Sequence, residues 1–302
     1  MIYLGERVEL ARLHYSAVES WFVHRNENDQ HRLQVAIMQL PGMEQYTNVD
    51  GASRYGWLEG FVLAGLQTMR EWVNHCPEKL RFTDFYELYV NKFAKGSDTF
   101  VDPEKRYNAT VLQNMLNVGV CPYCDDMRIQ VLDNDGKMVR TGEFDHYYPK
   151  AKDKFPALAM CFFNLVISCH TCNKIKMESP IGESPYEHDI ELHSRFVHNI
   201  DVGMNIACFP RERFSISLQA TEGMSVNEKV LALTKRYALY ADEAYEMLGK
   251  AQKYPIEKLE EVAIILGEND VDSIRRDLFG SPYDEGRLKY PHQKMKKDLI
   301  GY

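Results

Sequence analysis

The chain has 302 residues, of which 45% are hydrophobic and 26% are charged, and a formal net charge of -8 at pH 7. This composition is typical of a globular protein with a sizeable core, and it excludes the disordered, collagen-like and membrane-embedded classes. The acidic balance argues against a protein that coats nucleic acid unselectively, because affinity for phosphate comes from Lys and Arg.

The N-terminal sequence and the cysteine count indicate where such a protein works. Residues 1–15 lack a basic stretch followed by an apolar run, and no segment is apolar over the length that a membrane span needs. We therefore expect a cytoplasmic protein without a membrane segment. Seven cysteines, four of them in two Cys-x-x-Cys pairs, favour metal binding over disulfides in that compartment.

Residues 1–115 are predicted to be mainly helical. Apolar side chains recur at helical spacing from Tyr55 to Val73, which predicts one amphipathic helix across this stretch. Residues 41–51 are polar and rich in turn formers, so we expect a loop there. The role of this region stays open between binding a partner such as an ATPase, forming an oligomer interface and contacting nucleic acid.

Two further helices are expected before the first cysteine pair. Thr83 is a candidate N-cap for a helix that runs through Phe93. Thr110 and Gln113 form a capping-box pattern, and Gly119 suits the end of the helix that they begin. That helix then leads directly into the first cysteine pair.

The centre of the chain, residues 116–215, is predicted to contain short strands and turns. Residues 129–132 have the composition of a strand, and the Asp-Asn-Asp-Gly sequence at 133–136 is typical of a hairpin turn. Residues 138–144 are expected to return as the partner strand. The sequence thus predicts a small strand-rich core between helical flanks.

Helical periodicity resumes in residues 216–302. Ser225 and Glu228 form a second capping-box pattern, and Pro255 and Gly267 are expected to begin and end a helix. The predicted fold class is α+β, a mainly helical protein with a central metal-clamped ββα finger.

The two cysteine pairs predict a zinc site. Two residues between thiolates allow both sulfurs to reach one ion from a tight turn, and two such turns complete a tetrahedral Zn²⁺ site. The 44 residues between the pairs exceed the usual ribbon spacing, so the insert is expected to be a folded unit. A closed four-thiolate site leaves no position for water and is therefore structural. The expected ligands are Cys121, Cys124, Cys169 and Cys172.

A second group of residues lies within this insert and just after it. Cutting a phosphodiester needs an activated water, a base and positive charge near the oxygens. His146 is a candidate base, because imidazole titrates near neutral pH. Asp145 and Asn173 offer hard oxygen ligands for Mg²⁺ or Mn²⁺. Each residue alone has an ordinary structural interpretation, and Asn164 taken alone would be a turn cap.

Basic residues accompany this group. Residues 137–176 contain seven basic and three acidic residues, a net charge of +4 in an otherwise acidic protein. Such a cluster is usually a solvated surface, but it is also able to bind phosphate. Lys150, Lys174 and Lys176 are the expected contacts to a nucleic-acid backbone.

The order of these motifs resembles the HNH endonucleases of the ββα-metal class. The chain has CPYC, then FDHYYPK, then FFNLVISCHTCNKIK over residues 121–176, although Asn stands where many members have the final His. The resemblance implies that His146 is the general base and that Asp145 and Asn173 hold the catalytic ion. It implies that Asn164 orients the histidine loop. His170, between the second cysteines, is expected to be an auxiliary residue at most.

The function expected from this resemblance is hydrolysis of DNA to 5′-phosphate and 3′-hydroxyl ends. A looser similarity of residues 225–236 and 290–299 to the tails of Septu- and retron-associated nucleases suggests anti-phage defence. Two alternatives stay open: an RNA- or tRNA-directed nuclease toxin, and a non-catalytic zinc-ribbon module that binds nucleic acid. The histidines at 188, 193 and 198 are expected to have ordinary surface and core roles.

Overall fold

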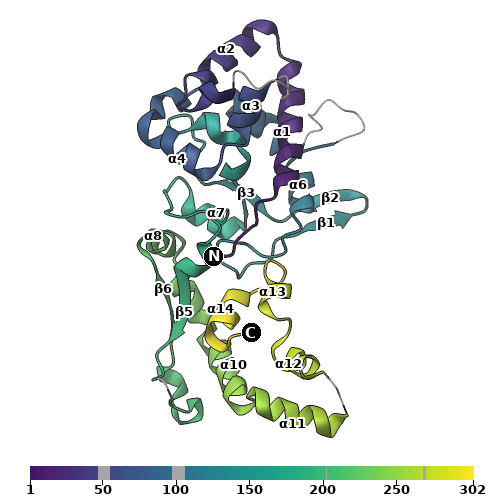
Figure 1. Ribbon diagram of the computed structural model, residues 1–302, viewed down its shortest axis with the longest axis vertical. Coiled ribbons are helices and arrows are strands. Elements are labelled where there is room, and N and C mark those ends of the chain that lie inside the picture. The colour runs from purple at the N-terminus through teal and green to yellow at the C-terminus, as the bar shows by residue number, and fades with distance from the viewer. Residues whose placement is uncertain (47–54, 97–105, 202, 268–269) are drawn as a thin grey trace.

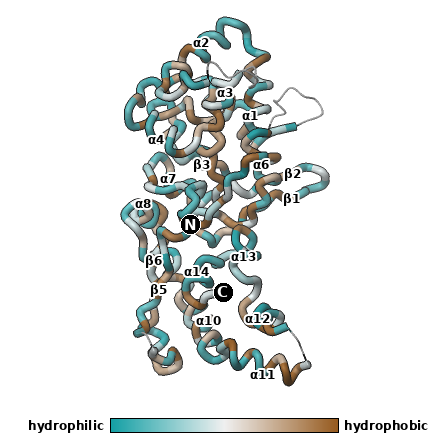
Figure 2. The backbone as a smooth tube through the Cα atoms, viewed as in Figure 1, coloured by the Kyte–Doolittle hydropathy of each residue, from teal (hydrophilic) through white to brown (hydrophobic). Residues whose placement is uncertain are grey.

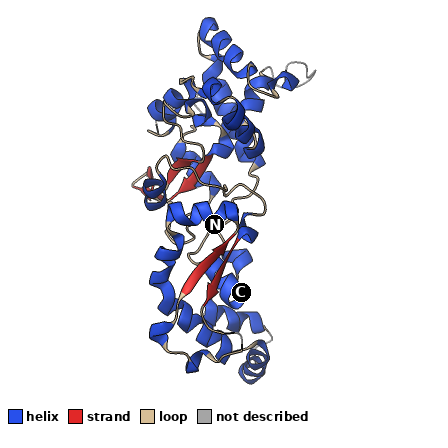
Figure 3. Cartoon of the chain, turned by 90° about the vertical axis from the view of Figure 1, so that its left-hand side faces the viewer, coloured by secondary structure: helices blue, strands red, loops and turns tan. Residues whose placement is uncertain are grey.

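The computed structural model describes residues 1–46, 55–96, 106–201, 203–267 and 270–302. Helices dominate, and the strands form short antiparallel pairs, so the predicted mainly helical α+β class is confirmed. The molecule is elongated, with N-terminal helices at one end, C-terminal helices at the other and the strand pairs between them (Figures 1 and 3). No helix in the described residues is long and apolar enough to cross a membrane.

The N-terminal helices pack around a cluster of aromatic side chains. Phe61 stacks on Trp72 and on Phe85, with ring centroids 5.4 Å apart in each pair. All three side chains are fully buried. The elements of this region are α1 (Val8–Val23), α2 (Glu27–Met38), η1 (Met43–Tyr46), α3 (Gly56–Val62), α4 (Leu66–His75), η2 (Pro77–Leu80), α5 (Asp84–Leu88), the π-helical turn η3 (Tyr89–Phe93) and α6 (Ala109–Leu116).

The single helix predicted from Tyr55 to Val73 is wrong, because the chain turns between α3 and α4. Gly65 is extended there, with φ -69° and ψ 166°, and begins the second helix. This turn brings Trp72 back onto Phe61, a packing that one straight helix cannot provide. Of the predicted loop at 41–51, Met43–Tyr46 forms a 3-10 turn, and the remaining positions from 47 lie outside the described residues.

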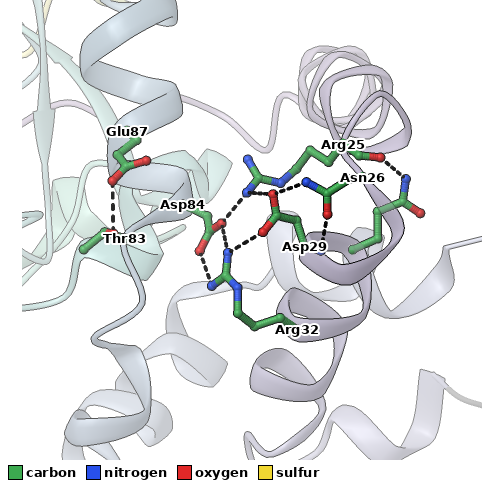
Figure 4. A network of polar contacts seen from close by, with 8 residues as sticks. Arg25, Asn26, Asp29, Arg32, Thr83, Asp84 and Glu87 are labelled. Carbon is green, nitrogen blue, oxygen red and sulfur yellow. Dashed lines mark hydrogen bonds and ion pairs between the residues drawn. The ribbon is translucent and has the colours of Figure 1, made fainter.

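A buried carboxylate fixes α5 against the corner between α1 and α2 (Figure 4). Asp84, 5% exposed, accepts hydrogen bonds from Arg25 at 2.8 Å and from Arg32 at 2.7 and 3.0 Å. These bonds hold in place the segment that continues into the π-helical turn η3.

The caps of α5 and α6 differ from the predicted ones in chemistry. The helix begins after Thr83 as predicted, but the Thr83 hydroxyl makes no capping bond to the backbone. The capping box at Thr110 is wrong, since Asn108 accepts from the backbone N–H groups of residues 110 and 111. Asn117, with φ 50°, ends α6 in place of Gly119. Gly119 instead lets the backbone at 288–289 approach, where a side chain would meet the Lys289 carbonyl oxygen at 3.0 Å.

Two strand pairs form the centre of the molecule. The predicted hairpin forms from β1 (Val131–Asn134) and β2 (Lys137–Arg140), joined through Asp135 and Gly136, both at positive φ. Its first strand lies two residues later than the predicted 129–132, because Asp133 and Asn134 pair with β2 and are not part of the turn. The expected return strand at 138–144 is wrong in extent, because it ends at 140 and a new strand begins at 143. That strand, β3 (Glu143–His146), pairs with β4 (Leu165–Ser168), and α7 (His170–Lys176) follows at once.

The C-terminal part packs helices against a third strand pair, β5 (Ser194–His198) with β6 (Ile216–Ala220). Pro255 and Gly267 flank α11 (Ile256–Leu266), as predicted. The capping box at Ser225 is wrong, because α8 begins one turn earlier, after Thr221. The remaining helices are α8 (Glu222–Leu231), α9 (Leu233–Tyr237), α10 (Ala241–Lys253), α12 (Val271–Phe279), α13 (Tyr283–Gly286) and α14 (Gln293–Ile300).

The largest apolar cluster joins the N-terminal helices to β3, β4 and the cysteine turns, so these segments share one core. A second cluster lies between β5, β6, α10 and α14. Ile264, Ile265 and Leu266 at the C-terminal end of α11 are exposed. Figure 2 shows the hydrophobic colour at that end of the helix. The domain boundaries at 115 and 215 stay predictions.

Candidate functional site

The four predicted cysteines gather at one point. Their sulfur atoms all lie within 4.8 Å of one another, and all four residues are buried. The first pair sits in a turn closed by a hydrogen bond from the Asp125 N–H to the Cys121 carbonyl, 2.8 Å long. In the second pair Cys169 caps α7, and its sulfur accepts from the Cys172 N–H at 3.3 Å.

This donor set fits Zn²⁺. Zinc–sulfur bonds of about 2.3 Å in a tetrahedron place the sulfurs about 3.8 Å apart, which small adjustments of the observed cluster reach. The Arg236 guanidinium donates to the Cys172 sulfur at 3.2 Å and to Asp126 at 3.3 Å, so a positive charge offsets part of the thiolate charge. Four buried cysteines so placed could hold a zinc ion that joins the residue-121 turn to α7.

Strand β3 follows the first cysteine pair in the chain and helix α7 contains the last cysteine of the cluster, and the two elements bring Asp145, His146 and Asn173 to one cavity. Asp145 and His146 end β3, and Asn173 lies in the middle of α7. All three line a cavity of about 230 Å³. Lys150 and Glu178 add one basic and one acidic side chain to the lining. Tyr86 from α5 also lines the cavity, so the N-terminal helical region contributes directly to the site.

His146 is buried and held in one orientation. Its Nε2 lies 3.0 Å from the Ala159 carbonyl oxygen, and because a carbonyl only accepts, Nε2 carries the proton. Its Nδ1 has no hydrogen-bond partner among the described residues. Burial, with the nearby charges of Lys150 and Lys176, holds the pKa of His146 well below its usual value. The imidazole is therefore neutral at pH 7 and presents a free lone pair.

Tyr89 and Asn164 hold the backbone on either side of His146. The ring of Tyr89 lies edge-to-face on His146, with centroids 4.5 Å apart, and its hydroxyl donates to the Phe144 carbonyl. Asn164, fully buried, accepts from the Tyr148 N–H at 2.7 Å. It donates to the carbonyl oxygens of Tyr148 and Leu158 at 3.1 and 2.9 Å. Asn164 thus lies outside the cavity wall and ties the loop after His146 to the segment before β4.

Asp145 has close partners on both carboxylate oxygens. The Tyr123 hydroxyl donates to one oxygen at 2.7 Å, and the Lys176 ammonium lies 3.1 and 3.2 Å from the two. Burial raises the pKa of Asp145, and the Lys176 charge and the Tyr123 hydrogen bond oppose that rise. A carboxylate has about four lone-pair sites, and these contacts occupy three of them.

The side chain of Lys176 is buried, whereas the sequence predicted an exposed contact to phosphate. We expected a side chain that contacts phosphate, but Lys176 is 0% exposed and donates to the His146 carbonyl oxygen at 2.7 Å. Its charge compensates that of Asp145 inside the protein. Lys174 is exposed on α7, and Lys150 is half-buried, with its ammonium 4.9 Å from the centre of the Tyr89 ring. Burial lowers the pKa of Lys150, and the charge of Asp145 partly opposes that shift.

Asn173 is held by Glu143, a residue outside the predicted site. Its Nδ2 donates to Oε2 of Glu143 at 2.5 Å, and His170 Nδ1 lies 2.8 Å from the other oxygen. Burial favours a raised pKa for Glu143, but the hydrogen bonds from Asn173 and His170 outweigh it and leave the pKa below its usual value. Glu143 stands two residues before Asp145 on one strand, a period-two signal that would have identified it.

A second group, Glu183, Glu187 and His193, also places its ligand atoms within 4.8 Å of one another. His193 Nδ1 lies 2.6 Å from Glu183, and Arg70 lies 3.1 Å from Glu187. These three residues could hold a metal ion, so the ordinary role expected for His193 stays a prediction.

Comparison of the chain with models of protein families, with curated proteins and with solved structures finds no match. The function is therefore inferred from the residues of the site themselves.

Proposed function

We propose that the protein is a metal-dependent endonuclease of the HNH type that hydrolyses phosphodiester bonds in DNA. The observation that carries this proposal is the buried, neutral His146, whose Nδ1 has no partner among the described residues and which lines a cavity with two hard oxygen donors. Buried polar atoms without partners are rare, and an unprotonated imidazole nitrogen of a residue that lines a cavity is a candidate proton acceptor.

The residues of the cavity divide the reaction between them. A water oxygen attacks phosphorus, His146 Nδ1 accepts the proton of that water, and the bond from phosphorus to the 3′ oxygen breaks. The leaving oxygen takes a proton from solvent, which yields a 5′-phosphate and a 3′-hydroxyl. A divalent cation held by Asp145 and Asn173 would supply positive charge beside the phosphoryl and leaving oxygens. The ammonium of Lys150, which lines the cavity, would add a second positive charge beside the same oxygens.

The zinc cluster and Asn164 account for the rigidity that this chemistry needs. The ion would hold the residue-121 turn against α7, while Tyr123 from that turn reaches Asp145. Asn164 restrains the loop that follows His146. Catalytic groups need to be held within about 0.5 Å of their working geometry, and these contacts serve that purpose.

Lysines beside the cavity favour a polyanionic substrate. Lys152 and Lys174 are exposed, and the Lys152 ammonium lies 5.6 Å from the centre of the Tyr86 ring. The overall charge of -8 disfavours binding of nucleic acid over the whole surface, so we expect nucleic acid to bind near the exposed Lys152 and Lys174. The contacts favour phosphate without distinguishing the sugar, and the test therefore includes RNA.

The proposal is tested on plasmid, single-stranded DNA and tRNA, each with Mg²⁺ and with EDTA. We expect cleavage of DNA with Mg²⁺, loss with EDTA, and loss in His146→Ala at unchanged zinc content. His31→Ala, at an exposed position on α2, is the matched control. Cleavage of tRNA alone would reassign the substrate to RNA, and wild-type cleavage by His146→Ala would refute the catalytic role.

A role in anti-phage defence is part of this proposal, and it rests only on the loose sequence resemblance of residues 225–236 and 290–299 to the tails of Septu- and retron-associated nucleases. Cells that express the wild-type protein with its neighbouring genes should form fewer phage plaques than cells that express His146→Ala. Equal plaque counts would remove the defence role and leave the nuclease proposal intact.

A further inference from the structure

One face of α7 and one strand residue form a short hydrogen-bonded chain beside the catalytic cavity. His170 and Asn173 are three positions apart on α7, so both side chains lie on the same face of the helix. Each contacts a different oxygen of Glu143, at 2.8 and 2.5 Å. Glu143 therefore bridges β3 and α7 at the point where the two elements carry Asp145 and Asn173.

The bridge determines which way the Asn173 amide faces. A carboxylate only accepts hydrogen bonds, so the atom of Asn173 next to Glu143 is the amide nitrogen. The carbonyl oxygen then takes the other position, and Asn173 lines the cavity together with Asp145 and His146. Only the oxygen is able to ligate a hard divalent cation, because the amide nitrogen has no available lone pair.

Without Glu143 the amide is free to rotate by half a turn, because the two orientations of an asparagine are nearly equal in shape. One orientation presents a ligand to the cation, and the other presents two N–H donors that repel it. The described residues that line the cavity include Asn173 but not Glu143, so Glu143 acts through its neighbour.

We propose that Glu143 is a positioning residue, which fixes the Asn173 amide with its oxygen toward the catalytic cation. This inference rests on the proposed function, since it concerns the ion of that same site. Residues that orient metal ligands typically change metal affinity by about 10- to 100-fold when they are removed. Glu143→Ala is expected to fall in this range.

The test is a double-mutant cycle read out as Mn²⁺ affinity of the zinc-loaded protein, measured by titration calorimetry without substrate. Asn173→Ala and Glu143→Ala should each weaken Mn²⁺ binding by about tenfold or more. The double variant should bind no more weakly than Asn173→Ala, because Glu143 has nothing left to orient. Glu143→Gln keeps an acceptor oxygen and should restore most of the affinity. Glu9→Ala, at an exposed position on α1, is the control.

The outcomes separate this inference from the proposed function. A further loss of affinity when Glu143→Ala is added to Asn173→Ala would make Glu143 a ligand in its own right and overturn the positioning role. Unchanged affinity in Glu143→Ala, with weakened affinity in Asn173→Ala, would overturn the inference and leave the nuclease proposal standing. Absence of Mn²⁺ binding by the wild-type protein would overturn both.

Discussion

Replacing Asn164 by alanine should damage both the stability and the activity of the protein. The side chain is fully buried and makes three hydrogen bonds, to the N–H and carbonyl of Tyr148 and to the carbonyl of Leu158. Alanine leaves these three backbone groups without their side-chain partner. The Leu158 carbonyl still accepts from the Cys161 N–H at 3.2 Å, so only the N–H and carbonyl of Tyr148 are left unsatisfied. Each unsatisfied group costs about 1–3 kcal/mol, and partial relaxation brings the expected total to about 2–4 kcal/mol.

The same substitution should slow DNA cleavage, because the loop after His146 loses its connection to the segment before β4. The free energy of unfolding is obtained from urea titration, and the cleavage rate is measured well below the melting temperature. Asn114→Ala, at an exposed position on α6, is the matched control and should lie within about 0.5 kcal/mol of wild type. An Asn164→Ala variant that loses less than about 1 kcal/mol would refute the role assigned to these bonds.

Three further predictions concern the cysteine cluster, the N-terminal helices and pH. Cys172→Ser should lower the zinc content measured by elemental analysis from one ion per chain toward none, whereas Cys208→Ser, at an exposed cysteine, should leave it unchanged. Asp84→Ala should lower the free energy of unfolding, measured in urea, by about 2–3 kcal/mol. This is less than the loss for a fully buried ion pair, because Arg25 and Arg32 are partly exposed. A loss under about 1 kcal/mol would contradict the role assigned to Asp84. Burial lowers the pKa of His14 to about 4, so its folded form binds a proton less readily than the unfolded chain, and stability should fall as pH drops from about 6.5 toward 4. The loss amounts to about 3 kcal/mol, and His14→Gln should flatten this part of the stability profile if the assignment is correct.

Local sequence signals predicted those features that local chemistry decides. Pro255 and Gly267 flank α11 as expected, since proline favours a helix start and glycine accepts the positive φ after its end. Asp135 and Gly136 likewise form the turn between β1 and β2. The predicted clustering of the four cysteines is confirmed. It could be predicted because the two-residue spacing within each pair brings two sulfurs together.

Features that depend on distant partners were not accessible from local patterns. The break between α3 and α4 is set by stacking of Trp72 on Phe61, which no periodicity records. Lys176 belongs to a basic run that suggested a phosphate contact, but the buried Asp145 draws its ammonium inward. Tyr123 contacts Asp145, and Arg236 contacts the sulfur of Cys172. Each contact joins segments that are distant in the sequence, so only the fold reveals it.

The central physical claim is the protonation state of one imidazole, and nitrogen NMR measures it directly. Zinc-loaded protein carrying ¹⁵N-labelled histidine is compared at pH 7 with the His146→Ala variant, which assigns the resonances of His146. We predict a neutral ring with its proton on Nε2 and an unprotonated Nδ1, as the 3.0 Å contact to the Ala159 carbonyl requires. A doubly protonated ring, or a proton on Nδ1, would contradict the assignment of His146 as the catalytic base.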